Sequence, residues 1–258
     1  MKILVCIKQV PDMESKFRLD AAGTWYADSD LAWRMNEYDE YAVEQAVQLK
    51  EQVGEGCELT VLSIGPDRVK ETMKKALAMG CDRGVHVKDD AGQGKDCFEI
   101  ASVVAEFIGG KGFDLIFTGM QSQDRGSAQV GVLVGELAGI PAVSTVVDFA
   151  YAEGTLTVKR ELEGGMKAVV RLKTPALVTC QLGLNTPRYP TLPNIMKAKK
   201  KEIETIEIAA LLQADPRLST EKMYFPEKKG GGLVLEGDPG QLADQLLGIL
   251  REKTAVLK

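Results

Sequence analysis

The chain has 258 residues, of which 45% are hydrophobic and 27% are charged, as is ordinary for a soluble globular protein. Its 37 acidic and 32 basic side chains give a net charge of -5, which argues against a nucleic-acid surface because such a surface needs clustered lysine and arginine. No apolar run approaches the roughly 20 residues that span a bilayer, and the opening stretch Ile3–Ile7 is too short for a signal peptide. We therefore expect a cytoplasmic protein with no direct membrane insertion.

The first two-thirds of the chain alternate between apolar runs, typical of buried strands, and segments with helical spacing of apolar residues. In the first helical segment Ala42 and Ala46 recur at that spacing, and Asn36 stands where a helix N-cap is expected. This alternation predicts an α/β protein with a parallel sheet and helices on both faces. The predicted strands are residues 3–10, 59–64, 84–87 and 114–118, and the predicted helices are residues 36–51, 67–79, 96–108 and 127–138.

The pattern changes after residue 141. Runs of β-forming residues separated by glycine turns predict a small antiparallel region, followed by one more buried strand. From Gly183 onward the periodicity is lost, apart from one short amphipathic helix. We therefore expect a domain over residues 1–182 and an irregular arm over residues 183–258 that packs on another protein. The predicted strands are residues 143–151, 155–162, 167–172 and 176–181, and the predicted helix is residues 241–252.

Few residues have the pattern of a catalytic or metal site. The five cysteines include no CxxC pair, and their spacing fits neither a zinc nor an iron–sulfur site. The single histidine, His86, lies in an apolar-alternating run, and we interpret it as structural. No carboxylate pair stands out as acid and base, so we predict no catalytic residue and no metal.

The loop after the fourth predicted strand, residues 118–131, is the best candidate for a ligand site. It is rich in small polar residues and runs into a helix, whose N-terminal N–H groups suit a phosphate. Gly126 would allow close backbone approach, Ser127 would cap the helix, and Arg125 would supply charge. An ordinary polar loop with a serine cap explains the local sequence equally well. No GxxxxGK[ST] motif and no early GxGxxG motif occurs, so ATP hydrolysis and NAD-linked hydride transfer have little support.

Several long segments carry motifs that occur together, in the same order, in one family. They are residues 2–12 (KILVCIKQVPD), 35–44 (MNEYDEYAVE), 76–84 (ALAMGCDRG), 158–179 (opening VKRELEGG and closing LKTPALVT) and 185–201 (NTPRYPTLPNIMKAKKK). Together they resemble the β (small) subunit family of the electron transfer flavoproteins, and the similarity extends from Met1 to about Ile206. The segment 158–179 is similar to the family signature, and 185–201 looks like the family's partner-recognition loop.

The resemblance implies a parallel nucleotide-binding sheet of the adenine nucleotide α-hydrolase-like, Rossmann type, in a heterodimer with an α subunit. One FAD would be held mainly by the α subunit. This chain would hold a second adenine nucleotide, which is AMP in simple carriers and a second FAD in electron-bifurcating members. The implied contacts with the nucleotide are Cys6, Asn36, Tyr38, Asp39, Ile64, Gln121, Asp124, Arg125, Gly126, Ser127, Ala128, Gln129, Val130 and Gly131.

The resemblance also implies an electron carrier rather than an enzyme. Electrons would come from dehydrogenases, such as acyl-CoA dehydrogenases, and leave through FAD to a membrane-associated, quinone-linked oxidoreductase. We expect residues 189–201 to dock the dehydrogenases. The prolines at 187, 190 and 193 preset an extended conformation that holds Leu192 out as the anchor, with the lysines as a steering rim. The alternative is that Leu192 is a core residue and the lysines are a solvated face. The expected partner contacts are Tyr189, Leu192, Pro193, Ile195, Met196 and Lys197.

The nucleotide loop departs from both subtypes of the family. Residues 128–131 (AQVG) match the core of the bifurcating motif Asp-Gly-Asp-Thr-Ala-Gln-Val-Gly-Pro, but the second Asp and the final Pro are absent. AMP-type members have Asn-Gln-Thr-Gly at these positions. We favour AMP over a second FAD. An ATP- or AMP-binding regulatory protein of the same fold is the other alternative, although it does not explain residues 183–201.

Overall fold

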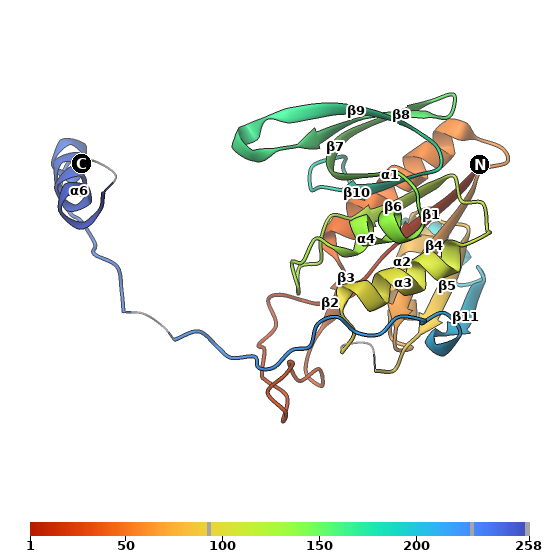
Figure 1. Cartoon of the computed structure of the whole chain (residues 1–258), viewed down its shortest axis with the longest axis horizontal. Helices are drawn as coiled ribbons and strands as arrows, with labels where there is room; N and C mark the ends of the chain where they lie inside the picture. The colour runs from red at the N-terminus through yellow and green to blue at the C-terminus, as the bar shows by residue number, and fades with distance from the viewer. Residues whose placement is uncertain (92–93, 228–229, 256–258) are drawn as a thin grey trace. The chain divides into compact units, whose positions relative to one another are not determined.

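The computed structural model describes residues 1–91, 94–227 and 230–255. The chain forms two units, Met1–Met223 and Tyr224–Lys258 (Figure 1). The larger unit contains the sheet and the candidate site. The smaller unit contains one helix.

The larger unit is built on a nine-stranded sheet. Its strands are β1 (Lys2–Cys6), β4 (Glu58–Gly65), β5 (Arg83–Lys88), β6 (Leu115–Gly119), β7 (Ala142–Ala152), β8 (Thr155–Glu161), β9 (Lys167–Lys173), β10 (Ala176–Cys180) and β11 (Ile203–Glu207). Their order is β11-β5-β4-β1-β6-β10-β7-β8-β9, parallel as far as β7 and antiparallel from β7 to β9. The predicted α/β fold with a small antiparallel region is confirmed. Because β1 pairs with β4 on one side and β6 on the other, the strand order reverses beside β1.

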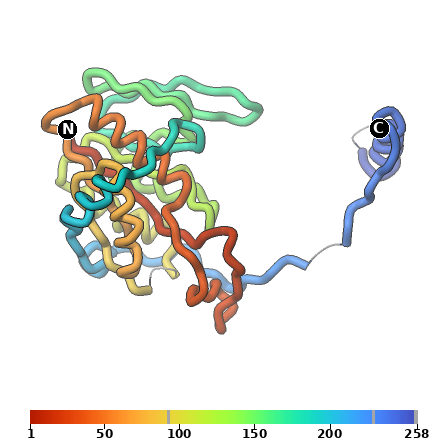
Figure 2. Tube along the Cα trace, turned by 180° about the vertical axis from the view of Figure 1, so that it is seen from behind, coloured from red at the N-terminus to blue at the C-terminus, as the bar shows by residue number. Residues whose placement is uncertain are grey.

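Helices cover both faces of this sheet (Figures 1 and 2). They are α1 (Glu37–Val53), α2 (Val69–Met79), α3 (Cys97–Ile108) and α4 (Val130–Leu137). Val43 of α1 and Met73 of α2 belong to the same buried cluster as Ile3 of β1. Leu4 belongs to the cluster on the other face, which includes residues of α3 and α4. Neighbouring strand residues point to opposite faces, so β1 serves both clusters, and its sequence is continuously apolar for that reason.

Residues 183–223 pack within the larger unit, although their sequence predicts an irregular arm. Helix α5 (Leu192–Ala198) begins after its N-cap Thr191, with Pro193 in the first turn. Strand β11 then pairs in parallel with β5. The expectation that the prolines hold an extended segment is therefore wrong for residues 192–198. The fixed φ of proline fits both an extended segment and the first turn of a helix. The sequence alone therefore does not distinguish the two conformations.

A second, two-stranded sheet lies between β1 and α1 and was not predicted. Strands β2 (Gln9–Pro11) and β3 (Trp33–Met35) pair antiparallel, so the predicted strand 3–10 is interrupted after Cys6. The loop between them is closed by a β-bridge between Leu19 and Tyr26. This loop brings Trp25 and Tyr26 to the candidate site described below.

The smaller unit contains α6 (Pro239–Lys253), which confirms the predicted amphipathic helix. Asp238 and Gln241 form a capping box at its start. None of its residues is buried, and Leu246 and Leu247 are 50% and 41% exposed. In the described part of the chain, none of the helices combines the length and the hydropathy that crossing a bilayer requires.

Candidate functional site

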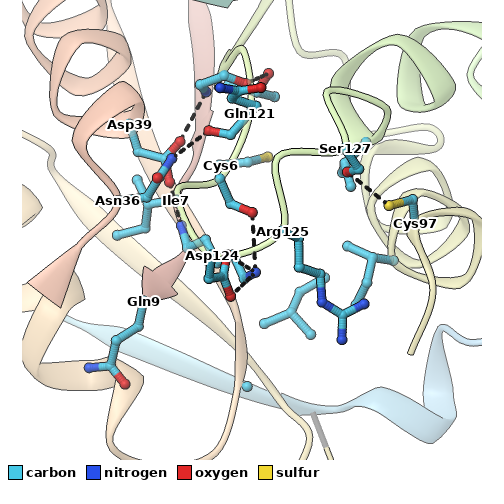
Figure 3. A pocket seen from close by; sticks show the side chains of 18 of the residues that line it. Cys6, Ile7, Gln9, Asn36, Asp39, Cys97, Gln121, Asp124, Arg125 and Ser127 are labelled. Atoms are coloured by element: carbon cyan, nitrogen blue, oxygen red, sulfur yellow. Dashed lines mark hydrogen bonds and ion pairs between the residues drawn. The ribbon is translucent and has the colours of Figure 1, made fainter. Parts of the chain in front are cut away.

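A cavity of about 190 Å³ lies at the carboxyl ends of β1, β4 and β6, where the strand order reverses. Its lining includes Cys6 at the end of β1, Gly65 at the end of β4 with Pro66 directly after it, and Ser127 in the loop after β6. Figure 3 shows Cys6 and Ser127 among the lining residues. The loop after β6 is the one in which the sequence predicts a site. Of the predicted nucleotide contacts, the residues that line the cavity are Cys6, Asn36, Asp39, Ile64, Gln121, Asp124, Arg125, Ser127, Ala128, Gln129, Val130 and Gly131, whereas Tyr38 and Gly126 do not line it.

Asp39, in the first turn of α1, ties together the ends of β1 and β6. Its buried carboxylate accepts hydrogen bonds from Lys8 N at 2.6 Å and Gly119 N at 3.1 Å. Burial raises the pKa of Asp39 to about 7, against the opposing effect of these N–H donors. A Cβ on residue 119 would overlap Asp39 Oδ1 and lie 2.8 Å from Tyr38 Cβ, so this close approach requires glycine.

Asn36 holds the loop after β6 instead of capping α1. It occupies the N-cap position, but its side chain makes no capping hydrogen bond. Asn36 Nδ2 donates to Gln121 O at 2.9 Å, and Gln123 N donates to Asn36 Oδ1 at 3.0 Å. Gln121 Nε2 in turn donates to the hydroxyl of Tyr38 at 2.9 Å, which gives Tyr38 an indirect role at the cavity. The predicted N-cap position is therefore confirmed, but the capping hydrogen bond is not made, because the amide bridges two segments that are far apart in sequence.

Lys8 and Asp124 form an ion pair in the cavity lining that was not predicted. Lys8 Nζ lies 2.7 Å from Asp124 Oδ2 and 3.3 Å from Ser122 Oγ. The side chain of Asp124 is only 4% exposed. Burial lowers the pKa of Lys8, and the neighbouring Asp124 carboxylate opposes that shift. The pair holds the loop after β6 against the end of β1.

The start of α4 is open to an anion. The N-cap residue is Gln129, whose side chain makes no capping hydrogen bond. The N–H groups of a first helical turn have no partner within the helix, so here they are suited to a phosphate. Ser127, the predicted cap, instead lies 3.2 Å from Cys97 Sγ through its hydroxyl (Figure 3). Gly126 and Ala128 have φ values of +61° and +54°, which turn the backbone sharply just before the helix.

Gly131 brings α4 directly onto the sheet. A Cβ on this residue would lie 2.6 Å from Thr118 Oγ1 of β6 and 2.7 Å from Thr179 Cγ2 of β10. Glycine is therefore required by the contact between helix and sheet, in addition to any contact with a ligand. This contact places the helix N-terminus at the cavity.

Two tryptophan–arginine stacks form a wall of the cavity that sequence reasoning missed. Arg68 lies over the ring of Trp33 at 3.8 Å, and Arg125 lies over the ring of Trp25 at 4.4 Å. Arg125 also donates to Lys95 O at 2.9 Å. The chain has only two tryptophans, and both lie between β1 and α1. Their clustering in one short region was the sequence signal that could have indicated an aromatic wall. In this wall Arg68 Nε is buried and finds no hydrogen-bond partner within the described residues, as expected for a site that takes a polar ligand.

The segment before the smaller unit is tied to two sides of the cavity. Asp96, which caps α3 and lines the cavity, accepts hydrogen bonds from the backbone N–H groups of Arg217 and Leu218, the second at 2.8 Å. Met223 N donates to Gly23 O at 2.7 Å, and Gly23 belongs to the loop that carries Trp25. We call residues 213–223 the strap.

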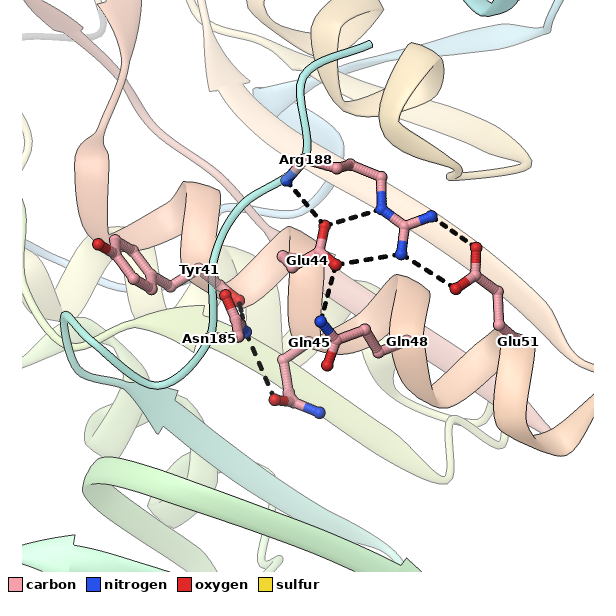
Figure 4. A network of polar contacts seen from close by, with 7 residues as sticks. All are labelled: Tyr41, Glu44, Gln45, Gln48, Glu51, Asn185 and Arg188. Carbon is pink, nitrogen blue, oxygen red and sulfur yellow. Dashed lines mark hydrogen bonds and ion pairs between the residues drawn. The ribbon is translucent and has the colours of Figure 1, made fainter. Parts of the chain in front are cut away.

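The predicted recognition segment, residues 185–201, is fixed to α1 near its start and is exposed around Leu192. Asn185 Nδ2 donates to Tyr41 O at 3.0 Å, and Arg188 pairs with Glu44 and Glu51 of α1 (Figure 4). Leu192 is 79% exposed, so the alternative that it is a core residue of this chain is wrong. The other predicted partner contacts, Tyr189, Pro193, Ile195, Met196 and Lys197, are also exposed.

One lysine of the predicted steering rim is not free. Lys201 Nζ donates to Leu77 O at 3.0 Å and also to Cys81 O. It fixes the end of α5 to α2, so the rim consists of Lys197, Lys199 and Lys200, which are exposed.

The fold and the cavity define an α/β protein with a candidate ligand site at the reversal of strand order. Residues 23–211 match the family described as the electron transfer flavoprotein domain. The chain is 36% identical to the electron transfer flavoprotein subunit beta of Methylophilus methylotrophus over 98% of both chains, and 36% identical to that of Bacillus subtilis over the whole of both. It is also 36% identical to the human subunit beta over 92% of this chain and 93% of the human one. The chain belongs to the electron transfer flavoprotein family, as a homologue of its β subunits.

Proposed function

We propose that this chain is the β subunit of a heterodimeric electron transfer flavoprotein that accepts electrons from dehydrogenases, such as acyl-CoA dehydrogenases. The electrons would pass through FAD to a membrane-associated, quinone-linked oxidoreductase. The observation that carries the proposal is the recognition segment, in which an exposed Leu192 stands on a helix whose base is fixed by Arg188. An apolar side chain held out on a rigid base is suited to fill a pocket on a partner. Lys197, Lys199 and Lys200 would steer an acidic partner and increase the rate of encounter.

The proposed cofactors are an FAD held mainly by the α subunit and an AMP in the cavity of this chain, with a second FAD as the alternative. The FAD carries the electrons when it is bound. The residues of this chain hold the nucleotide: the uncapped start of α4 would bind its phosphate, and Arg125 and Lys95 would add positive charge beside it. The nucleotides released by denaturing the purified heterodimer test this assignment. One FAD with one AMP supports it, and two FAD support the alternative.

The unit Tyr224–Lys258 is proposed to pack on the α subunit. Tyr224 and Phe225 are 73% and 61% exposed, and α6 has no buried residue. Large aromatic and apolar side chains that are exposed together in this way favour an interface with another protein. Without its partner, the chain should be cut by proteases in this unit first. A chain that resists protease there without a partner would contradict the proposal.

The carrier function is tested by mixing the purified heterodimer with a dehydrogenase and its acyl-CoA substrate. Bleaching of flavin absorbance that depends on the dehydrogenase is the expected result. A heterodimer without flavin absorbance would refute the function.

A further inference from the structure

His86 is the only histidine of the chain, and its side chain is fully buried in β5. Its Nε2 lies 2.7 Å from the carbonyl oxygen of Gly65. A carbonyl oxygen only accepts hydrogen bonds, so the ring donates from Nε2. Its Nδ1 is also buried and has no partner within the described residues. The geometry therefore assigns the neutral tautomer that is protonated on Nε2.

The acceptor of this hydrogen bond belongs to a wall of the cavity. Gly65 ends β4 and opens the turn into α2, and Gly65, Pro66, Arg68 and Val69 all line the cavity. The turn is tight, because Gly65 has a φ of +150° and a Cβ there would lie 2.8 Å from Val69 Cγ1. The Gly65 carbonyl also accepts from Asp89 N at 3.0 Å. His86 does not line the cavity and lies behind this wall.

A second side chain holds the other end of the same turn. Gln9 Nε2 donates to Arg68 O at 3.1 Å and to Thr72 Oγ1 at 2.8 Å. The wall therefore runs between two fixed points, Gly65 and Arg68. Arg68 carries the stack on Trp33, so a movement of the turn would also move the aromatic wall.

Packing alone does not account for a histidine at this position. A buried nitrogen without a partner lowers stability, and an apolar side chain of similar size would avoid that loss. The donor on Nε2 is the property that an apolar residue cannot replace. We propose that His86 is a positioning residue of the nucleotide site: its Nε2–H fixes the Gly65 carbonyl and thereby holds the turn 65–69 against the bound nucleotide. This inference rests on the proposed function.

Two substitutions separate positioning from packing. His86→Gln keeps an N–H donor at a similar reach, whereas His86→Leu keeps an apolar body and removes the donor. Each variant is co-expressed with the α subunit and loaded with ¹⁴C-labelled AMP, and release is followed after a chase with unlabelled AMP. Melting temperatures are measured on the same heterodimers after the nucleotide has been removed.

We expect His86→Leu to release AMP about tenfold faster than the wild type, as the loss of one positioned hydrogen bond predicts. His86→Gln should stay within about threefold of the wild type. Unchanged release from His86→Leu, or equally fast release from both variants, would overturn the role of His86. A wild-type heterodimer that takes up no AMP and holds FAD here is assayed by the release of that FAD. One that holds neither nucleotide refutes the proposed cofactor, and the role of His86 with it.

The single histidine allows a direct test of the tautomer. The chain is labelled with ¹⁵N-histidine and combined with an unlabelled α subunit, so that one imidazole is observed. The nitrogen shifts should show a protonated Nε2 and an unprotonated Nδ1, and they should change when AMP is removed. A proton on Nδ1, or shifts that do not respond to AMP, would contradict the proposal.

Discussion

Arg188 holds the buried carboxylate of Glu44 through three hydrogen bonds. Its backbone N and Nε donate to Oε2 at 3.1 and 2.9 Å, and Nη2 donates to Oε1 at 3.0 Å (Figure 4). Burial alone would raise the pKa of Glu44, but hydrogen bonds from Arg188 and Gln48 hold it below its ordinary value. This contact joins the recognition segment to α1, and it lies four residues before the exposed Leu192.

Replacement of Arg188 by Met should leave the buried Glu44 carboxylate without the guanidinium that pairs with it. We expect a loss of about 3 kcal/mol in the free energy of unfolding, measured by urea denaturation of the heterodimer. The loss should shrink as the pH falls below about 4, because a carboxylate with a lowered pKa loses its contribution as it becomes protonated. The matched control is Glu51→Gln, which removes the partner whose side chain is 58% exposed and should cost less than about 1 kcal/mol. Equal losses in the two variants would contradict this account.

Leu192→Ala should slow electron transfer from the donor dehydrogenase without changing flavin content or melting temperature. The side chain is 79% exposed, so its truncation removes no packing within this chain. An interface anchor of this kind contributes roughly 2 kcal/mol or more, or about thirtyfold in the affinity for the donor. Stopped-flow flavin reduction at varied dehydrogenase concentration measures the change. Leu137→Ala on α4, 41% exposed, is the control and should leave the affinity unchanged.

Asp39 should make the stability of the protein depend on pH between about 4 and 7. Burial raises its pKa to about 7, so the folded state binds a proton more tightly than the unfolded state, where the pKa is about 3.9. Its contribution is therefore complete below about pH 4 and is lost as the pH rises to about 7, by up to about 4 kcal/mol. Asp39→Asn should flatten this part of the stability profile. Asp148→Asn at a surface ion pair should not, and parallel profiles for Asp39→Asn and the wild type would refute the assignment.

Gly131→Val should release the nucleotide and also destabilise the fold, because its Cβ would collide with Thr118 and Thr179. We expect a loss of about 1–3 kcal/mol in stability and reduced AMP per heterodimer, while the FAD of the α subunit is retained. Gly126→Ala is the control. A Cβ there meets open space, and only its positive φ costs about 1 kcal/mol. Full AMP content in Gly131→Val would place the site elsewhere.

The strap should restrain the cavity from outside. Leu218→Pro removes the N–H that donates to Asp96, whereas Leu218→Ala keeps it. We expect trypsin to cut after Lys222, within the strap, several-fold faster in the proline variant, and AMP to be released faster, because Asp96 loses one of its donors. The alanine variant should behave like the wild type in both assays. Identical cleavage of the two variants would show that the hydrogen bond does not hold the strap.

Much of the fold follows from short-range patterns. The apolar run Ile3–Val5 predicts a strand buried on both faces, and the change to glycine-separated β runs after residue 141 predicts the antiparallel strands. Helix α5 and strand β11 were missed because Pro193 and the run of lysines between the two elements are typical of an irregular segment. Their positions are set by packing on α2 and pairing with β5, which no local pattern reports.

The sequence by itself determined the strands of the main sheet other than β11, the loop 118–131 and the exposed character of the recognition segment, because each depends on residues close together in the chain. Only the tertiary structure decided which residues of these loops contact one another. Lys8 meets Asp124, and Asn36 bridges to Gln121 and Gln123, because the order β4-β1-β6 places these loops at one edge of the sheet. These contacts join residues more than eighty positions apart, and such pairs follow from strand order rather than from spacing in the chain.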